Sequence, residues 1–328
     1  MKIACAALAL SLAAFPALAQ NVKITPIGSH PGELCANDRA IVFEDPTGVR
    51  FLYDPAHNVT GGDDPRLGTI HLVLLSHMHG DHVGDLKLKA PGAGTCANSE
   101  RVPAPNSTTA DVVAAKNAAL VTTRAMAGFV HSKVNPLRGG DVKPMDFCAN
   151  LSVTVPVPAA CSSRIDLGGV FMAKAEGAAQ GVEITIVQSA HVNNAPPSLL
   201  SEAEREYGPA VGFVVKFTNG LVAYLTSDTA IHGDMKLVIQ DFYKPNLAVL
   251  NLGPNPGIFY SGAYAMNDLV RPASVILTHA NEPVTEGGKL RPGSQTAALI
   301  KQLKPAAHLA ISGRTMEFDG KGKCTAGC

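Results

Sequence analysis

Residues 69–85, TIHLVLLSHMHGDHVGD, join an apolar run to a dense cluster of metal-binding residue types. The first seven residues are almost wholly apolar, which is typical of a buried strand. Three histidines and an aspartate follow within the six positions from His77 to His82. Imidazole nitrogens and carboxylate oxygens bind Zn²⁺ and similar ions, and alternate residues of an extended loop project to the same side. The stretch therefore predicts a metal site at the end of a buried strand.

Three more polar residues, His191, Asp228 and His279, each follow a short apolar run later in the chain. A single histidine in such a place is more often packed in a core, and a solvated polar loop is the alternative for the first motif. Adjacent imidazoles in such a loop would repel one another when protonated, which disfavours that alternative. The recurring pattern favours ligand roles for all three. The other histidines lack this context and are left out of the site: His30, His57, His71, His131, His232 and His308.

The run SHMHGDHVGD, residues 76–85, resembles the signature of the metallo-β-lactamase superfamily, and the later polar residues follow in that family's order. The resemblance extends from residue 24 to about residue 311. It implies two ions with Asp228 as a bridge, and the two remaining sets of ligands are His77, His79 and His191 for the first ion and Asp81, His82 and His279 for the second. Zinc is the expected metal, with manganese or iron as alternatives.

The resemblance also implies the chemistry. Two ions about 3.5–4 Å apart would share a hydroxide whose pKa falls towards neutrality, and they would polarise the bond to be cleaved. The reaction would be hydrolysis without a covalent intermediate, and Asp81 would also act as a catalytic residue that orients the hydroxide. An aspartate at position 228 is the arrangement of lactonases, thioesterases and phosphodiesterases in the superfamily. Zinc β-lactamases with a cysteine ligand have the cysteine there instead.

Residues 226–253 are similar to the branch that contains ascorbate-6-phosphate lactonase, whereas segment 255–260 departs from it and leaves the substrate open. The first expectation is a metal-dependent hydrolase acting on a lactone or ester-like bond of a small molecule. A phosphodiesterase or a β-lactam hydrolase is the alternative on the same site. A non-catalytic periplasmic metal-binding protein is the alternative outside enzymes. Asn193 and Tyr260 are candidate polar contacts to a substrate carbonyl.

Short apolar runs separated by turn residues predict many strands. The expected strands are 22–28, 39–44, 49–53, 69–75, 151–157, 170–174, 182–188, 211–217, 221–226, 247–252 and 275–278. Helices are expected within 110–134 and over 235–242, 263–269 and 294–303, with a long surface loop over 91–110. Strand-rich halves that are each followed by helices indicate two sheets packed face to face. We therefore expect an α/β fold, a four-layer αβ/βα sandwich, as a single domain over residues 20–328.

The start of the chain has the features of a secretory signal peptide, residues 1–19. Lys2 precedes an apolar run, and an A-x-A cleavage site ends at Ala19. The run is too short to span a membrane, so we expect no stable membrane insertion and a periplasmic or secreted protein. Six cysteines then remain in a compartment that permits disulfides. Cys148 and Cys161 flank an expected strand and Cys324 and Cys328 lie close together, so we expect these two pairs, and Cys35 and Cys96 would then form the third.

The charge balance argues against one class of partner. Lysine and arginine number 27, aspartate and glutamate also number 27, and the sequence pI is about 7.2. Proteins that bind nucleic acids carry a basic surface. We therefore expect a small-molecule substrate and no nucleic acid.

Overall fold

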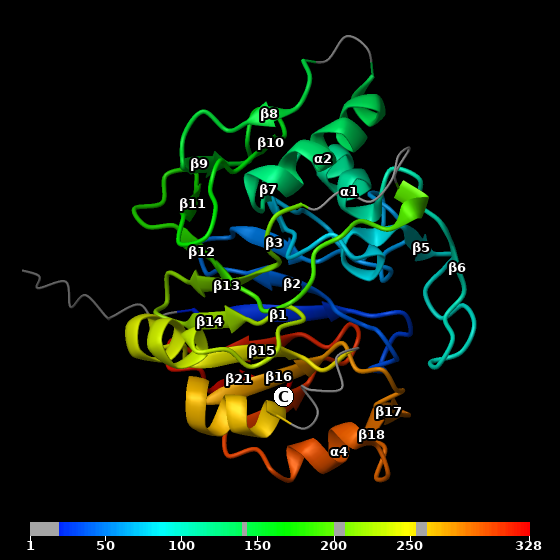
Figure 1. Ribbon diagram of the computed structural model, residues 1–328, viewed down its shortest axis with the longest axis vertical. Helices are drawn as coiled ribbons and strands as arrows, with labels where there is room; N and C mark the ends of the chain where they lie inside the picture. Colours follow the sequence, from blue (N-terminus) through cyan, green and yellow to red (C-terminus); the bar gives the residue numbers. More distant parts are fainter. Residues whose placement is uncertain (1–19, 140–142, 200–206, 254–260) are drawn as a thin grey trace, which may run out of the picture.

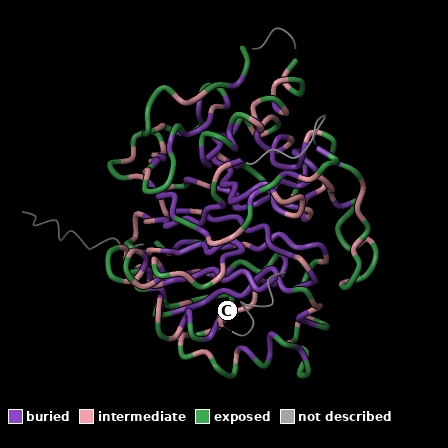
Figure 2. The backbone as a smooth tube through the Cα atoms, in the orientation of Figure 1, coloured by how far each residue is buried: buried purple, intermediate pink, exposed green. Residues whose placement is uncertain are grey.

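The computed structural model describes residues 20–139, 143–199, 207–253 and 261–328. The predicted signal peptide, residues 1–19, lies outside this part of the chain. Two mixed β-sheets lie across the middle of the molecule, and helices lie at its outside (Figure 1). The strands of both sheets are mostly buried, whereas the exposed backbone is concentrated in the helices and loops around them (Figure 2).

The first sheet has nine strands. In sheet order they are β21 (Cys324–Ala326), β20 (Met316–Phe318), β1 (Val22–Ile27), β2 (Ala40–Glu44), β3 (Arg50–Tyr53), β4 (Leu72–Leu74), β7 (Ala119–Val121), β10 (Cys161–Ser162) and β8 (Asp146–Phe147). Strands β1 to β3 form an antiparallel meander, and the pairs from β3 through β4, β7 and β10 to β8 are parallel. A hydrogen bond from Gly48 N to the Asp45 carbonyl oxygen (2.8 Å) closes the turn between β2 and β3.

The second sheet has eight strands. In sheet order they are β19 (Ala306–Leu309), β16 (Ser274–Thr278), β15 (Leu247–Asn251), β14 (Val222–Leu225), β13 (Val211–Lys216), β12 (Val182–Gln188), β11 (Val170–Ala175) and β9 (Ser152–Val155). Strand β13 is antiparallel to both β12 and β14, and β14, β15 and β16 are mutually parallel. Strands β12, β14 and β16 therefore run in one direction, and their carboxyl ends lie at the same edge of the sheet.

Helices flank the sheets. Helices α1 (Thr108–Lys116) and α2 (Arg124–Val134) pack together near β4, and η2 (Asn135–Arg138) continues α2. The π-helices η4 (Met235–Tyr243) and η5 (Ala265–Val270) pack against each other beside the second sheet, and α4 (Gln295–Ile300) lies nearby (Figure 1). The short elements in loops are η1 (Gly80–Gly84), η3 (Pro197–Leu199) and the pairs β5 (Leu86–Leu88) with β6 (Arg101–Pro103) and β17 (Thr285–Glu286) with β18 (Lys289–Leu290).

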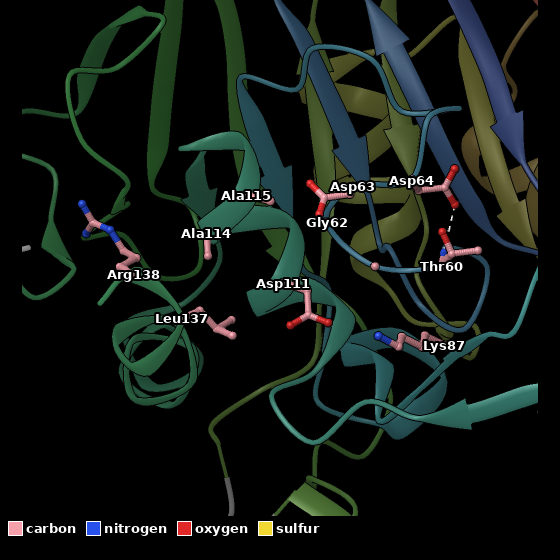
Figure 3. A pocket seen from close by; sticks show the side chains of 11 residues that line it. Thr60, Gly62, Asp63, Asp64, Lys87, Asp111, Ala114, Ala115, Leu137 and Arg138 are labelled. Carbon is pink, nitrogen blue, oxygen red and sulfur yellow. Dashed lines mark hydrogen bonds between the residues drawn. The ribbon is translucent and has the colours of Figure 1, made fainter. Parts of the chain in front are cut away.

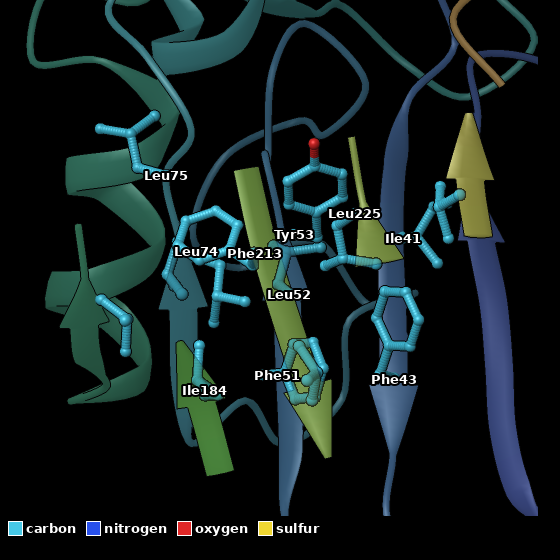
Figure 4. Close-up of a cluster of buried hydrophobic side chains, with 14 of the residues drawn as sticks. Ile41, Phe43, Phe51, Leu52, Tyr53, Leu74, Leu75, Ile184, Phe213 and Leu225 are labelled. Carbon is cyan, nitrogen blue, oxygen red and sulfur yellow. The ribbon is translucent and has the colours of Figure 1, made fainter. Parts of the chain in front are cut away.

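Side chains from both sheets meet in one apolar layer (Figure 4). The rings of Phe43 and Phe51 stack 4.8 Å apart, and both lie about 6 Å from Phe217, which follows β13 (6.1 and 5.9 Å). Tyr53 meets Phe213 edge to face at 6.1 Å. Each large apolar side chain that is fully buried contributes about 1.5–3 kcal/mol. This layer fixes the two sheets against each other and so fixes the strand ends that carry the polar motifs.

The predicted α/β four-layer arrangement in a single domain is confirmed, and the expected strands are present with shifted ends. Strand β4 is shorter than the predicted 69–75, although Ile70 and Leu75 are buried as well. The expectation of a helical stretch within 110–134 is confirmed by α2, but β7, which was not expected, lies in the same range and separates α1 from α2. Pairing of β7 with β4 and β10 in the sheet interior outweighs the helix propensity of the surrounding alanines. The expected loop 91–110 contains β6 and the start of α1.

The three predicted disulfides are present: Cys35–Cys96, Cys148–Cys161 and Cys324–Cys328. In the ranges that the structure describes, none of the helices is both long enough and apolar enough to cross a membrane.

Candidate metal centre

Loops after four strand ends bring the predicted ligands together. Strands β4, β12, β14 and β16 end at this place, and the residues that follow them are His77, His79, Asp81, His82, His191, Asp228 and His279. A hydrogen bond from Val211 N to the Ser76 carbonyl oxygen (2.9 Å) joins the end of β4 to the second sheet. All seven candidate residues lie in the described part of the chain, and the fold places them in adjoining groups.

The first group, called here the first cluster, consists of His77, His79 and His191. His79 Nδ1 lies 3.1 Å from His77 Nε2 and 3.2 Å from His191 Nε2. The three nitrogens lie within 4.8 Å of one another, as three ligands of one ion would. His77 is buried, whereas His79 and His191 are partly exposed.

The second cluster consists of Asp81, His82 and His279, whose ligand atoms also lie within 4.8 Å of one another. Asp228 stands between the clusters, because its Oδ2 lies 3.2 Å from both His82 Nε2 and His279 Nε2. It also falls in a group with His77 and His82. Asn251 Nδ2 donates to the other oxygen of Asp228, Oδ1 (3.0 Å), which orients the carboxylate.

The proton positions in the first cluster follow from the oxygens behind its rings. The Ser76 hydroxyl donates to Asp54 Oδ2 (2.7 Å), so Ser76 Oγ accepts from His77 Nδ1 (3.0 Å). Asn194 Oδ1 accepts from His79 Nε2 (3.1 Å). His77 Nε2 and His79 Nδ1 therefore face each other as two lone pairs, an arrangement that a cation between them stabilises.

The second cluster also presents atoms that a cation could join. His82 Nδ1 donates to Asp54 Oδ2 (2.7 Å), which turns the lone pair of Nε2 towards Asp228. His279 Nε2 is buried and has no hydrogen-bond partner among the described residues, although Asp228 Oδ2 is 3.2 Å away. A buried polar atom that makes no hydrogen bond costs free energy, whereas a metal ion would satisfy it. The residues present therefore suit a pair of metal ions.

The electrostatics favour the ligand forms of three histidines and of Asp228, whereas His82 holds a proton that a metal ion would displace. Burial lowers the pKa of His77 well below its usual range and also lowers those of His191 and His279, so these rings are neutral at pH 7. Burial opposes ionisation of Asp228, but His279 and His82 outweigh it and hold the pKa of Asp228 well below its usual value. Burial and Arg39 oppose protonation of His82, yet Asp228 and Asp54 raise its pKa to about 9. The space between His82 and Asp228 thus attracts positive charge.

Three residues at the centre were missed by the sequence analysis: Arg39, Asp54 and Asn251. Arg39 is buried next to β2 and contacts Asp81, and Asp54 follows β3 and contacts His82. Asn251 ends β15. Asp54 and Asn251 each stand at the carboxyl end of an apolar strand, which is the signal that revealed His191 and Asp228. Arg39 precedes its strand and carries no such signal.

The candidate substrate contacts have different outcomes. Asn193 is buried, and its side chain accepts from Met78 N (2.7 Å) and donates to the carbonyl oxygens of Tyr207, Gly208 and Pro209. These bonds occupy the amide, so the prediction that Asn193 contacts a substrate is wrong. Tyr260 and segment 255–260 lie outside the described residues.

The histidines left out of the site stay outside both clusters. His57 Nε2 bonds Asp85 Oδ1 (2.7 Å), and His131 Nε2 bonds Ser162 Oγ (2.8 Å). His308 lies near Cys324 and Cys328, but the sulfurs of that pair are joined in a disulfide and are not thiolate ligands.

A cavity of about 640 Å³ lies between the loop at Thr60–Asp64 and helix α1 (Figure 3). Its charged wall residues include Asp63, Lys87 and Asp111. None of the seven predicted ligands lines it. The cavity is therefore separate from the two histidine clusters.

A comparison with models of known protein families finds no match. A curated relative from Polynucleobacter asymbioticus, described as a UPF0173 metal-dependent hydrolase, is 27% identical over 259 residues, which cover 74% of this chain and 72% of the relative. Seven further relatives described as UPF0173 metal-dependent hydrolases match over 29% to 68% of their own length.

Two solved structures resemble this one over most of the chain. Igni18, described as a novel metallo hydrolase from the archaeon Ignicoccus hospitalis KIN4/I, has a TM-score of 0.58 at 17% identity and covers 91% of this chain and 99% of that chain. YhfI from Bacillus subtilis, described as a metallo-β-lactamase fold protein, has a TM-score of 0.52 at 12% identity with the same coverage. This chain has the metallo-β-lactamase fold. At these identities the two structures speak to the fold alone.

The resemblance seen in the sequence is confirmed at the level of the metallo-β-lactamase fold. Curated relatives that are described as metal-dependent hydrolases bear out the predicted class of enzyme. The closer likeness to the ascorbate-6-phosphate lactonase branch is not confirmed by these comparisons and stays a prediction.

Proposed function

We propose that this protein is a dinuclear metal-dependent hydrolase that cleaves a lactone or another ester-like bond of a small molecule. The observation that carries the proposal is the position of Asp228 between the two clusters. Its Oδ2 lies 3.2 Å from His82 Nε2 and from His279 Nε2, and it shares a group with His77 of the first cluster. A buried carboxylate that both clusters can reach suits two ions rather than one.

The chain's own residues orient the site. Ser76, Asp54 and Asn194 hold three imidazoles with a lone pair turned inward, which keeps reorganisation small when ions bind. When bound, the two ions supply a hydroxide nucleophile at neutral pH and polarise the scissile carbonyl. The Asp81 side chain is 32% exposed, and we place it beside the attacking water as the residue that orients it.

The charge of the site supports an ester-like substrate over a phosphodiester. Enzymes that act on phosphate esters surround the anion with arginine or lysine side chains. In the described part of the chain, the cationic side chain that contacts the predicted ligands is Arg39, and it is buried and paired with Asp81. Lys87 lines the separate cavity instead. The aspartate at position 228 is compatible with both substrate classes. The small number of cationic side chains at the ligands is therefore what favours an ester-like substrate.

Zinc is proposed as the native metal. Five of the seven predicted ligands are imidazoles, and zinc binds such nitrogen-rich sites. Manganese and iron remain the alternatives to be compared in reconstitution.

Export is also proposed, with cleavage after Ala19. The support is the pattern of residues 1–19 together with the three disulfides of the mature chain. Disulfides persist in the periplasm and outside the cell, whereas the cytosol keeps thiols reduced.

The test combines metal analysis with a substrate panel. The mature chain, residues 20–328, is loaded with zinc, dialysed, analysed for metal content and assayed on lactones, penicillins and aryl phosphodiesters. We expect close to two ions per chain and the fastest turnover on a lactone. The matched controls are His77→Ala and His279→Ala, which remove one ligand from each cluster.

Three results would contradict the proposal. A stoichiometry well below one ion after reconstitution would reject the metal centre. Turnover of a phosphodiester about tenfold faster than that of every lactone would replace the lactonase with a phosphodiesterase. Two bound ions without turnover of any substrate in a broad panel would favour the non-catalytic metal-binding protein.

A further inference from the structure

Arg39 is a buried cation placed behind the second cluster. Its side chain is 1% exposed, and its Nη2 lies 2.8 Å from Asp81 Oδ2. The same Nη2 lies 3.3 Å from His279 Nδ1. One guanidinium nitrogen therefore touches two of the three side chains that would hold the second ion.

The contact with His279 differs in kind from the contacts behind the other rings. Ser76, Asn194 and Asp54 present oxygen atoms to the outer nitrogens of His77, His79 and His82. A guanidinium has donors and no acceptor, so it satisfies His279 Nδ1 only when that atom is a lone pair. The ring proton then belongs on Nε2, the atom that faces Asp228 and that a metal ion would need as a lone pair.

The contact between Arg39 and Asp81 also disfavours an ion in the second cluster. A charge-assisted hydrogen bond of 2.8 Å occupies Asp81 Oδ2, which is also the oxygen that faces His279 Nε2 at 3.7 Å. The arginine charge offsets part of the carboxylate charge that would otherwise attract a divalent ion. In the buried surroundings of Arg39 this repulsion is weakly screened.

The backbone prevents a simple withdrawal of Arg39. His279 N donates to the Asp38 carbonyl oxygen (2.7 Å), and Arg39 N donates to Asn58 Oδ1 (3.0 Å). The Cys35–Cys96 disulfide also fastens the segment that precedes Arg39. Arg39 Nη1, meanwhile, is buried without a hydrogen-bond partner among the described residues.

We propose that Arg39 makes the second cluster the weaker of the two metal positions, so that the ions bind in sequence and the first cluster fills first. This inference rests on the proposed dinuclear site and adds an order and an affinity difference to it. Arg39 acts through Asp81 and His279 and is a positioning residue. The second ion then exchanges with the surrounding medium while the first stays bound.

The test is a titration of the metal-free mature protein with Co²⁺, followed by visible absorption and by metal content after gel filtration. Wild type should show two binding steps, the first tighter than the second by at least about tenfold. Removing the charge in Arg39→Met should tighten the second step and leave the first unchanged, because the repulsion on the second ion is lost. The expected size is about 10- to 100-fold, the range in which residues behind metal ligands usually change affinity, here with the opposite sign. Arg39→Lys keeps the charge and should keep the second step weak.

A matched control removes an arginine elsewhere. Arg50 lies at the opposite end of β3, paired with Glu44, and Arg50→Met should leave both steps as in wild type. Circular dichroism checks that each variant is folded. Two equal steps in wild type would overturn the inference without any variant, as would an unchanged second step in folded Arg39→Met. Failure of wild type and Arg39→Met to bind any Co²⁺ would instead reject the proposed metal centre itself.

Discussion

The first and second clusters reach the same carboxylate, Asp228, but they are built on different surroundings. In the first cluster His79 and His191 are partly exposed, and the oxygen that accepts from His79 belongs to Asn194, which is exposed. In the second cluster His82 and His279 are fully buried, with a carboxylate behind one ring and a guanidinium behind the other. The ligands alone make the two positions look equivalent, whereas the residues behind them do not.

The difference shows where affinity is set in such a centre. A ring that donates its outer proton to an oxygen offers a lone pair at no further cost. A ring that accepts from arginine must first rearrange its protons. The first cluster is therefore prepared for an ion, and the second is held back from one. Four sets of variants test this difference, in order of expected effect.

The largest effect is expected from Asp228→Ala, which removes the residue common to both clusters. Both ions should be lost on dialysis, and kcat/KM should fall by more than about a hundredfold, because a shared ligand is harder to replace than a residue behind one. Elemental analysis and a lactone assay measure the two effects. Retention of two ions at wild-type affinity would show that the clusters do not depend on Asp228.

Next, His77→Ala and His279→Ala should separate the clusters. Each variant should retain about one ion under saturating zinc, since one complete set of ligands remains. The ion in His279→Ala should resist dialysis, whereas the ion in His77→Ala should be lost more readily, because it depends on the weaker second cluster. Equal retention of the ion in the two variants would show that the two clusters bind metal with the same affinity.

Smaller effects on metal affinity are expected from residues that hydrogen-bond the ligand histidines. Asp54→Asn keeps the shape of the side chain but removes the charge that holds His82, and it should weaken the second ion by about 10- to 100-fold. Asn194→Ala removes an exposed hydrogen bond to His79 and should weaken the first ion by less than about tenfold. Competition with a chelator measures both constants. A larger effect of Asn194→Ala would reverse this ranking.

The smallest difference concerns the disulfides. The Cys35–Cys96 bond closes a loop with a sequence separation of 61, and this loop includes Arg39. The Cys148–Cys161 bond closes a loop with a sequence separation of 13, which contains none of the predicted ligands. Replacing each pair with serine should lower the free energy of unfolding by about 4 and about 3 kcal/mol respectively, because the longer loop gains more chain entropy when opened. Urea denaturation of the metal-free variants measures both. A smaller loss for Cys35→Ser with Cys96→Ser would mean that the loop before Arg39 is held by its hydrogen bonds instead.

The sequence predicted the parts of the structure whose signals are local. The histidine motif is contiguous, and His191, Asp228 and His279 each follow an apolar strand, so pattern alone located them. Long strands such as β12 were also found because apolar residues recur at every second position along them. Strand β7 was missed because three residues within an alanine-rich stretch carry little strand signal, and its neighbours in the sheet decide its conformation.

The contacts behind the ligands could not be predicted, because they join residues far apart in the chain. Arg39 and His279 are 240 positions apart, and Asp54 and His82 are 28 apart. A buried arginine reads in the sequence as a surface charge, since arginine is rarely buried. Only the packing of the loop before β2 against the end of β16 brings Arg39 to the site.

The Asn193 side chain joins two segments of the chain that lie on either side of β12 in the sequence. Its amide fixes Met78 on one side and the carbonyl oxygens of Tyr207, Gly208 and Pro209 on the other. One side chain thus fastens the loop that follows β4 to the segment that precedes β13, and His191 lies two residues before it. The position of His191 relative to His77 and His79 is therefore set by one amide as well as by the sheets. Losing that amide would loosen the first cluster without touching a ligand.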